Sequence, residues 1–245
     1  MKVAGARVVI TGAGGGIGRA TALRCARAGA ADLVCVDIDA QTAEETAAAC
    51  GGAAAYTCDV ADAAAVQELA DAVEADLGRL DVLVNNAAYQ QHAASIEEIT
   101  DERLDLTFRT NIHGYFHMAR AALPHMKERG SIINTGSVTG LKGSPKLLDY
   151  SSTKGAIHAF TKALAQNVID KGIRVNAVAP GPVWTPLNPA DSPADKVAEF
   201  GSDTQMKRAA QPEELSPAFV FLASPVCSGY ITGIVLPVTG SVGAI

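Results

Sequence analysis

The chain has 245 residues, of which 48% are hydrophobic and 19% charged, and its formal net charge is −6. This length favours a single domain over 1–245, and the acidic balance without a Lys/Arg block argues against a nucleic-acid partner. No apolar run approaches the ~20 residues of a membrane span and no signal peptide is visible, so we expect a cytoplasmic protein without a membrane partner.

Short β-branched runs alternate with Ala-rich helical segments along the chain. Strands are predicted at 6–11, 32–37, 53–59, 80–86, 131–137, 173–180 and 233–240, and the main helices at 17–28, 63–77, 102–126, around 150–154 and at 212–224. Strands that are apolar on both faces and joined by crossover helices predict an α/β fold with a parallel sheet, covered by helices on both faces. The proline-rich stretch 182–211 breaks this rhythm and is expected to be a substrate lid.

A glycine-rich turn between the first strand and the first helix carries the first functional signal. Gly12, Gly16 and Gly18 have the spacing GxxxGxG, which lets a pyrophosphate approach the backbone and the N–H groups that begin a helix. Asp37 ends the second strand, where a carboxylate binds an adenosine ribose and repels a 2′-phosphate. The alternative interpretation is a turn that holds the helix against the sheet without any ligand.

Tyr150 and Lys154 are four residues apart inside a run of small residues. This spacing places both side chains on one face of a helix, one turn apart. An amphipathic helix with a buried tyrosine and a solvent-reaching lysine gives the same pattern, so the pair alone assigns no function. Five scattered cysteines and five histidines without a ligand cluster predict buried, reduced thiols and no metal site.

Several motifs recur in the order and spacing of one known family. They are TGAGGGIG from Thr11, Asp59-Val60, NNAA at 85–88, Asn111, Ser137, YSSTK at 150–154 and PGPVWT at 180–185. Across essentially its whole length the chain resembles the short-chain dehydrogenase/reductase family. The resemblance implies a single-domain, doubly wound Rossmann fold, a nicotinamide cofactor and a homotetramer, with a dimer as the alternative.

The resemblance also implies catalytic roles for Asn111, Ser137, Tyr150 and Lys154. Ser137 is expected to end the fifth strand and hold the substrate oxygen, with which Tyr150 exchanges a proton. A free phenol has a pKa of about 10, so Lys154 and a positive nicotinamide are expected to lower it. Lys154 is further expected to bind the nicotinamide ribose, and Asn111 to hold a water that passes protons outward from Lys154.

The remaining implied contacts surround the cofactor and the substrate. The cofactor is expected to contact Gly12, Gly16, Ile17, Gly18, Asp37, Asp59, Val60, Asn86, Tyr150, Lys154, Pro180, Gly181, Val183 and Thr185. The substrate pocket is expected to include Gln90, His92, Val138, Leu148, Trp184 and Leu187.

These residues predict an NAD-dependent oxidoreductase acting on a secondary alcohol or ketone. A mixed polar and apolar pocket favours a small neutral sugar, polyol or hydroxy-ketone. The alternatives within the family are a 3-oxoacyl-thioester reductase and a dehydrogenase of hydrophobic alcohols or steroids. An alternative from another class is a dinucleotide sensor that has lost its chemistry.

Overall fold

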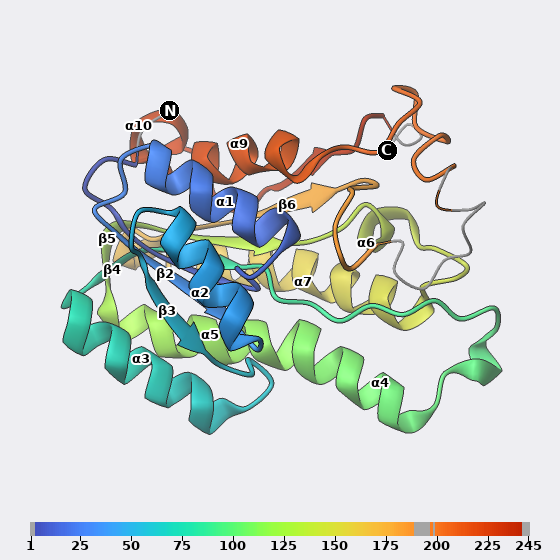
Figure 1. Ribbon diagram of the computed structural model, residues 1–245, viewed down its shortest axis with the longest axis horizontal. Coiled ribbons are helices and arrows are strands. Elements are labelled where there is room, and N and C mark those ends of the chain that lie inside the picture. Colours follow the sequence, from blue (N-terminus) through green and yellow to red (C-terminus); the bar gives the residue numbers. More distant parts are fainter. Residues whose placement is uncertain (1–2, 189–196, 198, 242–245) are drawn as a thin grey trace.

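The sheet is the centre of the fold in the computed structural model, which describes residues 3–188, 197 and 199–241 (Figure 1). Over these residues seven parallel strands pair in the order β3-β2-β1-β4-β5-β6-β7. The doubly wound parallel sheet is therefore confirmed, and its order reverses between β1 and β4, where such sheets bind ligands. The strands are β1 (Arg7–Thr11), β2 (Asp32–Asp37), β3 (Ala54–Thr57), β4 (Leu80–Asn85), β5 (Met126–Thr135), β6 (Arg174–Pro180) and β7 (Val235–Val238).

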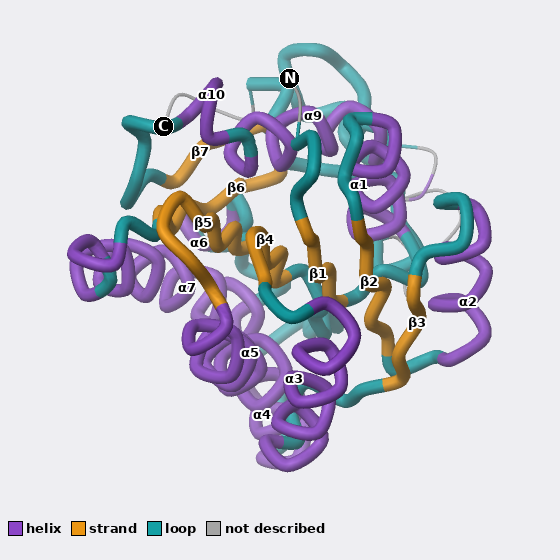
Figure 2. The backbone as a smooth tube through the Cα atoms, turned by 90° about the vertical axis from the view of Figure 1, so that its left-hand side faces the viewer, coloured by secondary structure: helices purple, strands orange, loops and turns teal. Residues whose placement is uncertain are grey.

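Helices cover both faces of the sheet, as Figure 2 shows end-on. One face carries α1 (Gly16–Arg27), α2 (Ala40–Ala49) and α9 (Pro212–Ala223), and the other carries α3 (Ala63–Leu77), α4 (Asp101–Phe108), α5 (Gly114–Ala122) and α7 (Leu148–Asn167). Two short helices, α6 (Thr139–Lys142) and α10 (Pro225–Ser228), lie in connections. Because successive strand residues point to opposite faces, Val8 and Ile10 pack in one apolar core and Val9 in the other.

The helix expected over 102–126 is present as a continuous helical segment over 101–125, but it is not α-helical throughout. A π-helical turn over Arg109–His113 separates α4 from α5, and a 3-10 turn follows at Leu123–His125. The π-turn contains Asn111, whose side chain bonds the backbone of Tyr89. Wider turns of this kind commonly occur at functional positions in helices.

Strand β5 begins and ends earlier than the expected 131–137, so Ser137 does not end it. After Thr135 the chain still follows β6, because Gly136 N donates to Val178 O at 2.7 Å and Val138 N to Pro180 O at 2.9 Å. These bonds hold Ser137 just beyond the carboxyl edge of the sheet.

The expected lid over 182–211 falls partly outside the described residues, which omit 189–196 and 198. Its two ends meet, because Trp184 N donates to Ala210 O and Ala210 N to Pro182 O, both at 2.9 Å. The Trp184 ring packs edge-on against Phe200, with 5.1 Å between ring centroids.

Two further features concern the described part of the chain. No helix in it is long and apolar enough to cross a membrane, and no group of three or more His, Cys, Asp or Glu side chains in it is placed to hold a metal ion. All five cysteines are free thiols, but Cys227 is exposed and Cys50 half-buried, so the expected burial fails for these two.

Candidate active site

A cavity of about 1080 Å³ runs along the carboxyl edge of the sheet. Its walls come from the glycine turn, the ends of β2, β4 and β5, helix α7 and the segment after β6. The structure brings nearly all of the expected cofactor contacts together here. The lining includes Gly12, Gly16, Ile17, Asp37, Asp59, Val60, Asn86, Tyr150, Lys154, Pro180, Gly181, Val183 and Thr185, but not Gly18.

The glycine turn is shaped by close backbone approach. Gly12 has a φ of +64°, and a Cβ there would lie 2.8 Å from the Cα of Ala87. A Cβ on Gly18 would lie 2.0 Å from the carbonyl oxygen of Gly12, so Gly18 packs α1 against the turn behind the cavity wall. No side chain caps α1 at its N-cap residue, Gly15. The first N–H groups of α1 are therefore suited to bind an anion such as a pyrophosphate.

Asp37 is held rigidly at the end of β2. Its Oδ2 accepts a hydrogen bond from Gly14 N at 2.8 Å, and its Oδ1 accepts one from Asp39 N at 3.2 Å. The carboxylate is thus fixed beside the glycine turn and lines the cavity together with the exposed Ile38. A carboxylate fixed in this place would repel a phosphate group on the 2′-oxygen of an adenosine ribose.

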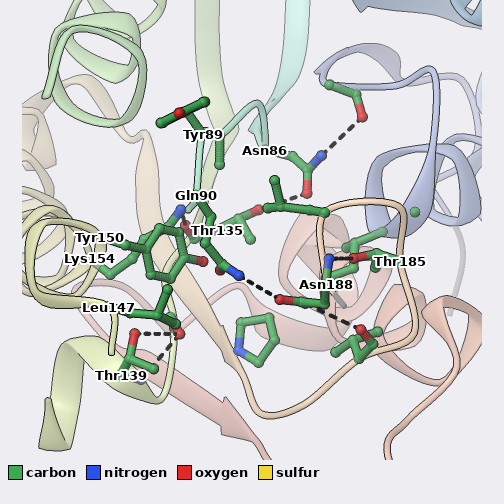
Figure 3. Close-up of a pocket in the computed structure, with 18 of the residues that line it drawn as sticks. Asn86, Tyr89, Gln90, Thr135, Thr139, Leu147, Tyr150, Lys154, Thr185 and Asn188 are labelled. Carbon is green, nitrogen blue, oxygen red and sulfur yellow. Dashed lines mark hydrogen bonds between the residues drawn. The ribbon is translucent and has the colours of Figure 1, made fainter. Parts of the chain in front are cut away.

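Asn86 joins the glycine turn to the end of β5 (Figure 3). Its Nδ2 donates to Gly12 O at 3.1 Å, and its Oδ1 accepts from Thr135 Oγ1 at 3.3 Å. On the expected adenine side, Asp59 Oδ1 accepts from Ala61 N at 2.9 Å, which fixes the turn after β3.

Ser137, Tyr150 and Lys154 line the inner end of the cavity. Ser137 Oγ accepts hydrogen bonds from Thr139 N at 3.1 Å and from Thr139 Oγ1 at 3.0 Å. Its own hydroxyl hydrogen is therefore available to an acceptor other than Thr139. Lys154 is fully buried, and its Nζ donates to Thr135 O at 2.7 Å and to Tyr115 Oη at 3.4 Å. The ammonium lies 5.4 Å from the centroid of the Tyr150 ring.

Burial dominates the acid–base properties of this cluster. It raises the pKa of Tyr150 to about 12, although a hydrogen bond with Ser137 opposes the rise. Burial also lowers the pKa of Lys154 to about 7, so its ammonium is partly neutralised near pH 7. In the protein without a cofactor, Lys154 therefore does not lower the pKa of Tyr150 as expected. A cationic ring in the cavity would add the positive charge that favours the phenolate.

Asn111 stands behind the cavity rather than in its lining. Its Oδ1 accepts from Tyr89 N at 2.8 Å, and its Nδ2 donates to Tyr89 O at 2.9 Å and to Thr153 Oγ1 at 3.1 Å. The side chain therefore fastens the chain after β4 to α7. These contacts assign its amide to positioning, and the expected proton relay from Lys154 stays a prediction.

The expected substrate residues divide into two groups. Gln90, His92, Val138 and Leu187 line the cavity, whereas Leu148 and Trp184 do not. Leu147, which directly precedes α7, lines it in place of Leu148. Gln90 Nε2 donates to Asn188 Oδ1 at 2.9 Å, which joins the chain after β4 to the chain after β6 across the cavity (Figure 3). Sequence reasoning missed Asn188, since nothing in its local pattern marks it.

His158 lies one turn beyond Lys154, and the sequence assigned no function to it. Its ring occupies the space beside Gly136, where a Cβ would lie 2.3 Å from Nε2. Nε2 accepts a hydrogen bond from Ser137 N at 3.4 Å. Burial, with Lys154 and Lys162 nearby, lowers the pKa of His158 to about 4, so the ring is neutral and supports the Ser137 backbone.

We expect His158 to make stability depend on pH. Between pH 4 and 6.5 the unfolded chain binds a proton that the folded ring does not, so the free energy of unfolding falls as pH drops from 6.5 towards 4, by about 3 kcal/mol at most. His158→Gln keeps an acceptor for Ser137 N and should flatten this dependence in urea unfolding at pH 7.5 and 5. His113→Gln, at an exposed position, is the control and should leave it unchanged. An unaltered slope in His158→Gln would contradict the assignment.

Comparison with known proteins agrees with this geometry. Residues 12–242 match a family described as enoyl-(acyl carrier protein) reductase. The NADPH-dependent aldehyde reductase 1 of Arabidopsis thaliana is 55% identical over 174 residues, 71% of this chain and 60% of that protein. The glucose and ribitol dehydrogenase of Daucus carota is 55% identical over 175 residues, again 71% and 60%. Both matches thus span less than two thirds of the plant proteins.

Among solved structures, a 3-ketoacyl-(acyl-carrier-protein) reductase from Brucella melitensis complexed with NADH superposes with a TM-score of 0.91. It is 33% identical, and the match covers 98% of this chain and 99% of that one. A doubly wound sheet with a glycine turn and a Ser–Tyr–Lys cluster at its carboxyl edge defines a Rossmann-fold oxidoreductase. The chain belongs to the short-chain dehydrogenase/reductase family.

Proposed function

We propose that the protein is an NAD-dependent dehydrogenase that interconverts a secondary alcohol and a ketone on a small neutral, hydroxylated substrate. The observation that carries the proposal is the meeting of Ser137, Tyr150 and Lys154 in one cavity with the glycine turn and Asp37. A bound nicotinamide would supply the hydride acceptor or donor.

The residues of the cavity fit such a cofactor. Close-packed glycines and the uncapped N-terminus of α1 suit a pyrophosphate, and Asp37 suits an unphosphorylated adenosine ribose. Lys154 already donates to Thr135 O and Tyr115 Oη, and one N–H of its three is left for a ribose hydroxyl. Pro180, Gly181, Val183 and Thr185 line the end of the cavity beyond β6, where they would hold the nicotinamide.

The protein's own groups then handle one proton. In the reductive direction Ser137 Oγ–H holds the carbonyl oxygen, and Tyr150 Oη gives that oxygen its proton. In the oxidative direction Tyr150 must be a phenolate to accept the proton, which its high pKa opposes at neutral pH. Alcohol oxidation is therefore expected to gain rate as pH rises.

A hydroxylated substrate is favoured by the amides near Tyr150. Gln90 and Asn188 meet across the cavity, and a purely apolar substrate would displace this bond without replacing it, at about 1–3 kcal/mol per unpaired group. The Daucus carota relative is named for glucose and ribitol, which agrees with this chemistry. Acyl thioesters are the second candidate, because the Brucella melitensis neighbour is a 3-ketoacyl reductase.

Steady-state kinetics with NAD and NADP in parallel test the proposal. We expect ribitol, glucose or a hydroxy-ketone to give a kcat/KM at least ~10-fold above steroids and acyl thioesters. Replacing Gln90 by Leu should reduce this difference by raising the KM of the polyol. The reverse order of substrates would contradict the polar pocket, and cofactor binding without any turnover would indicate a dinucleotide sensor. The homotetramer and the cytoplasmic location stay predictions.

A further inference from the structure

The chain after β4 crosses one side of the cavity without regular secondary structure. Within this segment, which we call the post-β4 loop (residues 86–95), Gln90 and His92 line the cavity. Bonds to neighbouring elements fix the loop on both sides of these residues. Asn111 holds Tyr89 through two hydrogen bonds, and Ala93 N donates to Lys146 O at 3.0 Å.

Arg103 of α4 fixes the middle of this loop. Its Nη1 donates to His92 O at 3.1 Å, and its Nη2 donates to Gln91 O at 2.5 Å. The same guanidinium binds Asp149 through two bonds, Nε to Oδ2 at 3.1 Å and Nη2 to Oδ1 at 3.0 Å. The planar guanidinium group of Arg103 thus contacts two carbonyls of the loop and a carboxylate of α7. The single ammonium group of a lysine cannot reproduce this arrangement.

Asp149 anchors the guanidinium beside the catalytic tyrosine. Its side chain is 1% exposed, and Thr107 Oγ1 also donates to its Oδ2 at 2.9 Å. Burial alone would raise the pKa of Asp149. The hydrogen bonds from Arg103 and Thr107 outweigh this effect and hold the pKa below its ordinary value, so the carboxylate is charged at neutral pH. Because moving the guanidinium would leave a buried charge unpaired, its position relative to Tyr150 is fixed.

We propose that Arg103 is a positioning residue for the substrate. By holding the carbonyls of Gln91 and His92, it sets the distance between the cavity-facing side chains of Gln90 and His92 and the hydroxyl of Tyr150. This inference rests on the proposed function, since it assigns the post-β4 loop to binding of the hydroxylated substrate. A displacement of about 1 Å in groups that position a substrate can cost on the order of 10²-fold in rate.

Arg103→Lys is the first test. With NAD saturating and ribitol varied, or the best polyol of the panel in its place, the KM of the polyol should rise about tenfold or more. The dissociation constant of NADH, measured by fluorescence titration, should stay within about twofold, because Arg103 does not line the cavity. Arg7→Lys is the matched control. It alters the ion pair of Arg7 with Asp32, which also lies outside the lining, and should leave both constants unchanged.

Two further variants separate positioning from stability. In the double variant Arg103→Met with Asp149→Leu both charges are removed, so no buried charge is left unpaired and the protein should fold. It still lacks the donors for the loop carbonyls, so the KM of the polyol should rise as in Arg103→Lys. Thr107→Val removes a bond to Asp149 but none to the loop, and its KM should stay within about twofold of wild type.

The outcomes are distinct. A wild-type enzyme that turns over polyols, with an unchanged KM in Arg103→Lys and in the double variant, overturns the role of Arg103 and leaves the proposed function intact. Equal rises in KM for Thr107→Val and Arg103→Lys also overturn it, since they show a general loosening around Asp149. A wild-type enzyme without turnover of any polyol or ketone overturns both proposals.

Discussion

Replacing Tyr150 by Phe is expected to lower kcat by about 10² or more while NADH still binds with near-native affinity. Tyr150 is 8% exposed, and phenylalanine fills the space of its ring, so the cavity wall is kept. Only the hydroxyl that exchanges the proton with the substrate oxygen is lost. Stopped-flow or steady-state rates at saturating substrate, together with fluorescence titration of NADH, measure the two effects separately.

The pH profile provides an independent check of Tyr150. In the wild type, alcohol oxidation should gain rate with rising pH, because burial holds the pKa of this phenol above its ordinary value. The Phe variant should lose that dependence along with the rate. Tyr56→Phe is the control, since Tyr56 Oη bonds Asp76 at the surface and lies outside the cavity lining. Near-wild-type turnover in Tyr150→Phe would remove Tyr150 from the proton-transfer role.

The wild-type protein is expected to prefer NAD over NADP by at least ~10-fold in kcat/KM, about 1.4 kcal/mol. Asp37 is the reason, because its carboxylate is fixed by Gly14 N and Asp39 N and lines the cavity, where it repels the 2′-phosphate of NADP. Asp37→Ser removes that charge and should reduce the preference, mainly by lowering the KM of NADP. Initial rates with both cofactors at fixed substrate give the ratio.

A control at the other end of the same strand sharpens this test. Asp32 begins β2 and pairs with Arg7 outside the cavity lining, so Asp32→Ser should leave the cofactor ratio unchanged. Equal efficiency of wild type with NAD and NADP would refute the role given to Asp37. Such a result would place this chain beside its NADPH-dependent relative from Arabidopsis thaliana.

Local patterns in the sequence were enough to predict the parallel sheet, whereas the reactive cluster was predicted from the resemblance to a known family. The apolar patterns of strands and crossover helices are formed by residues close together in the chain, so the parallel sheet could be predicted from these patterns alone. The i, i+4 spacing of Tyr150 and Lys154 likewise determines that they share a face of α7. Local irregularities were less predictable. The π-turn contains Asn111, whose side chain bonds Tyr89, 22 positions earlier in the sequence.

The substrate side of the cavity was decided only by tertiary packing. Leu147 lies just before α7 with a non-helical backbone, and it lines the cavity where Leu148, the first residue of the helix, does not. The pairs Gln90–Asn188 and Arg103–Asp149 join residues 98 and 46 positions apart. Whether such polar side chains meet depends on how loops and helices pack across the sheet, and no period in the sequence carries that information. The order of residues in the chain therefore determined the sheet and the position of the Ser–Tyr–Lys cluster at its edge, whereas packing determined which side chains line the rest of the cavity.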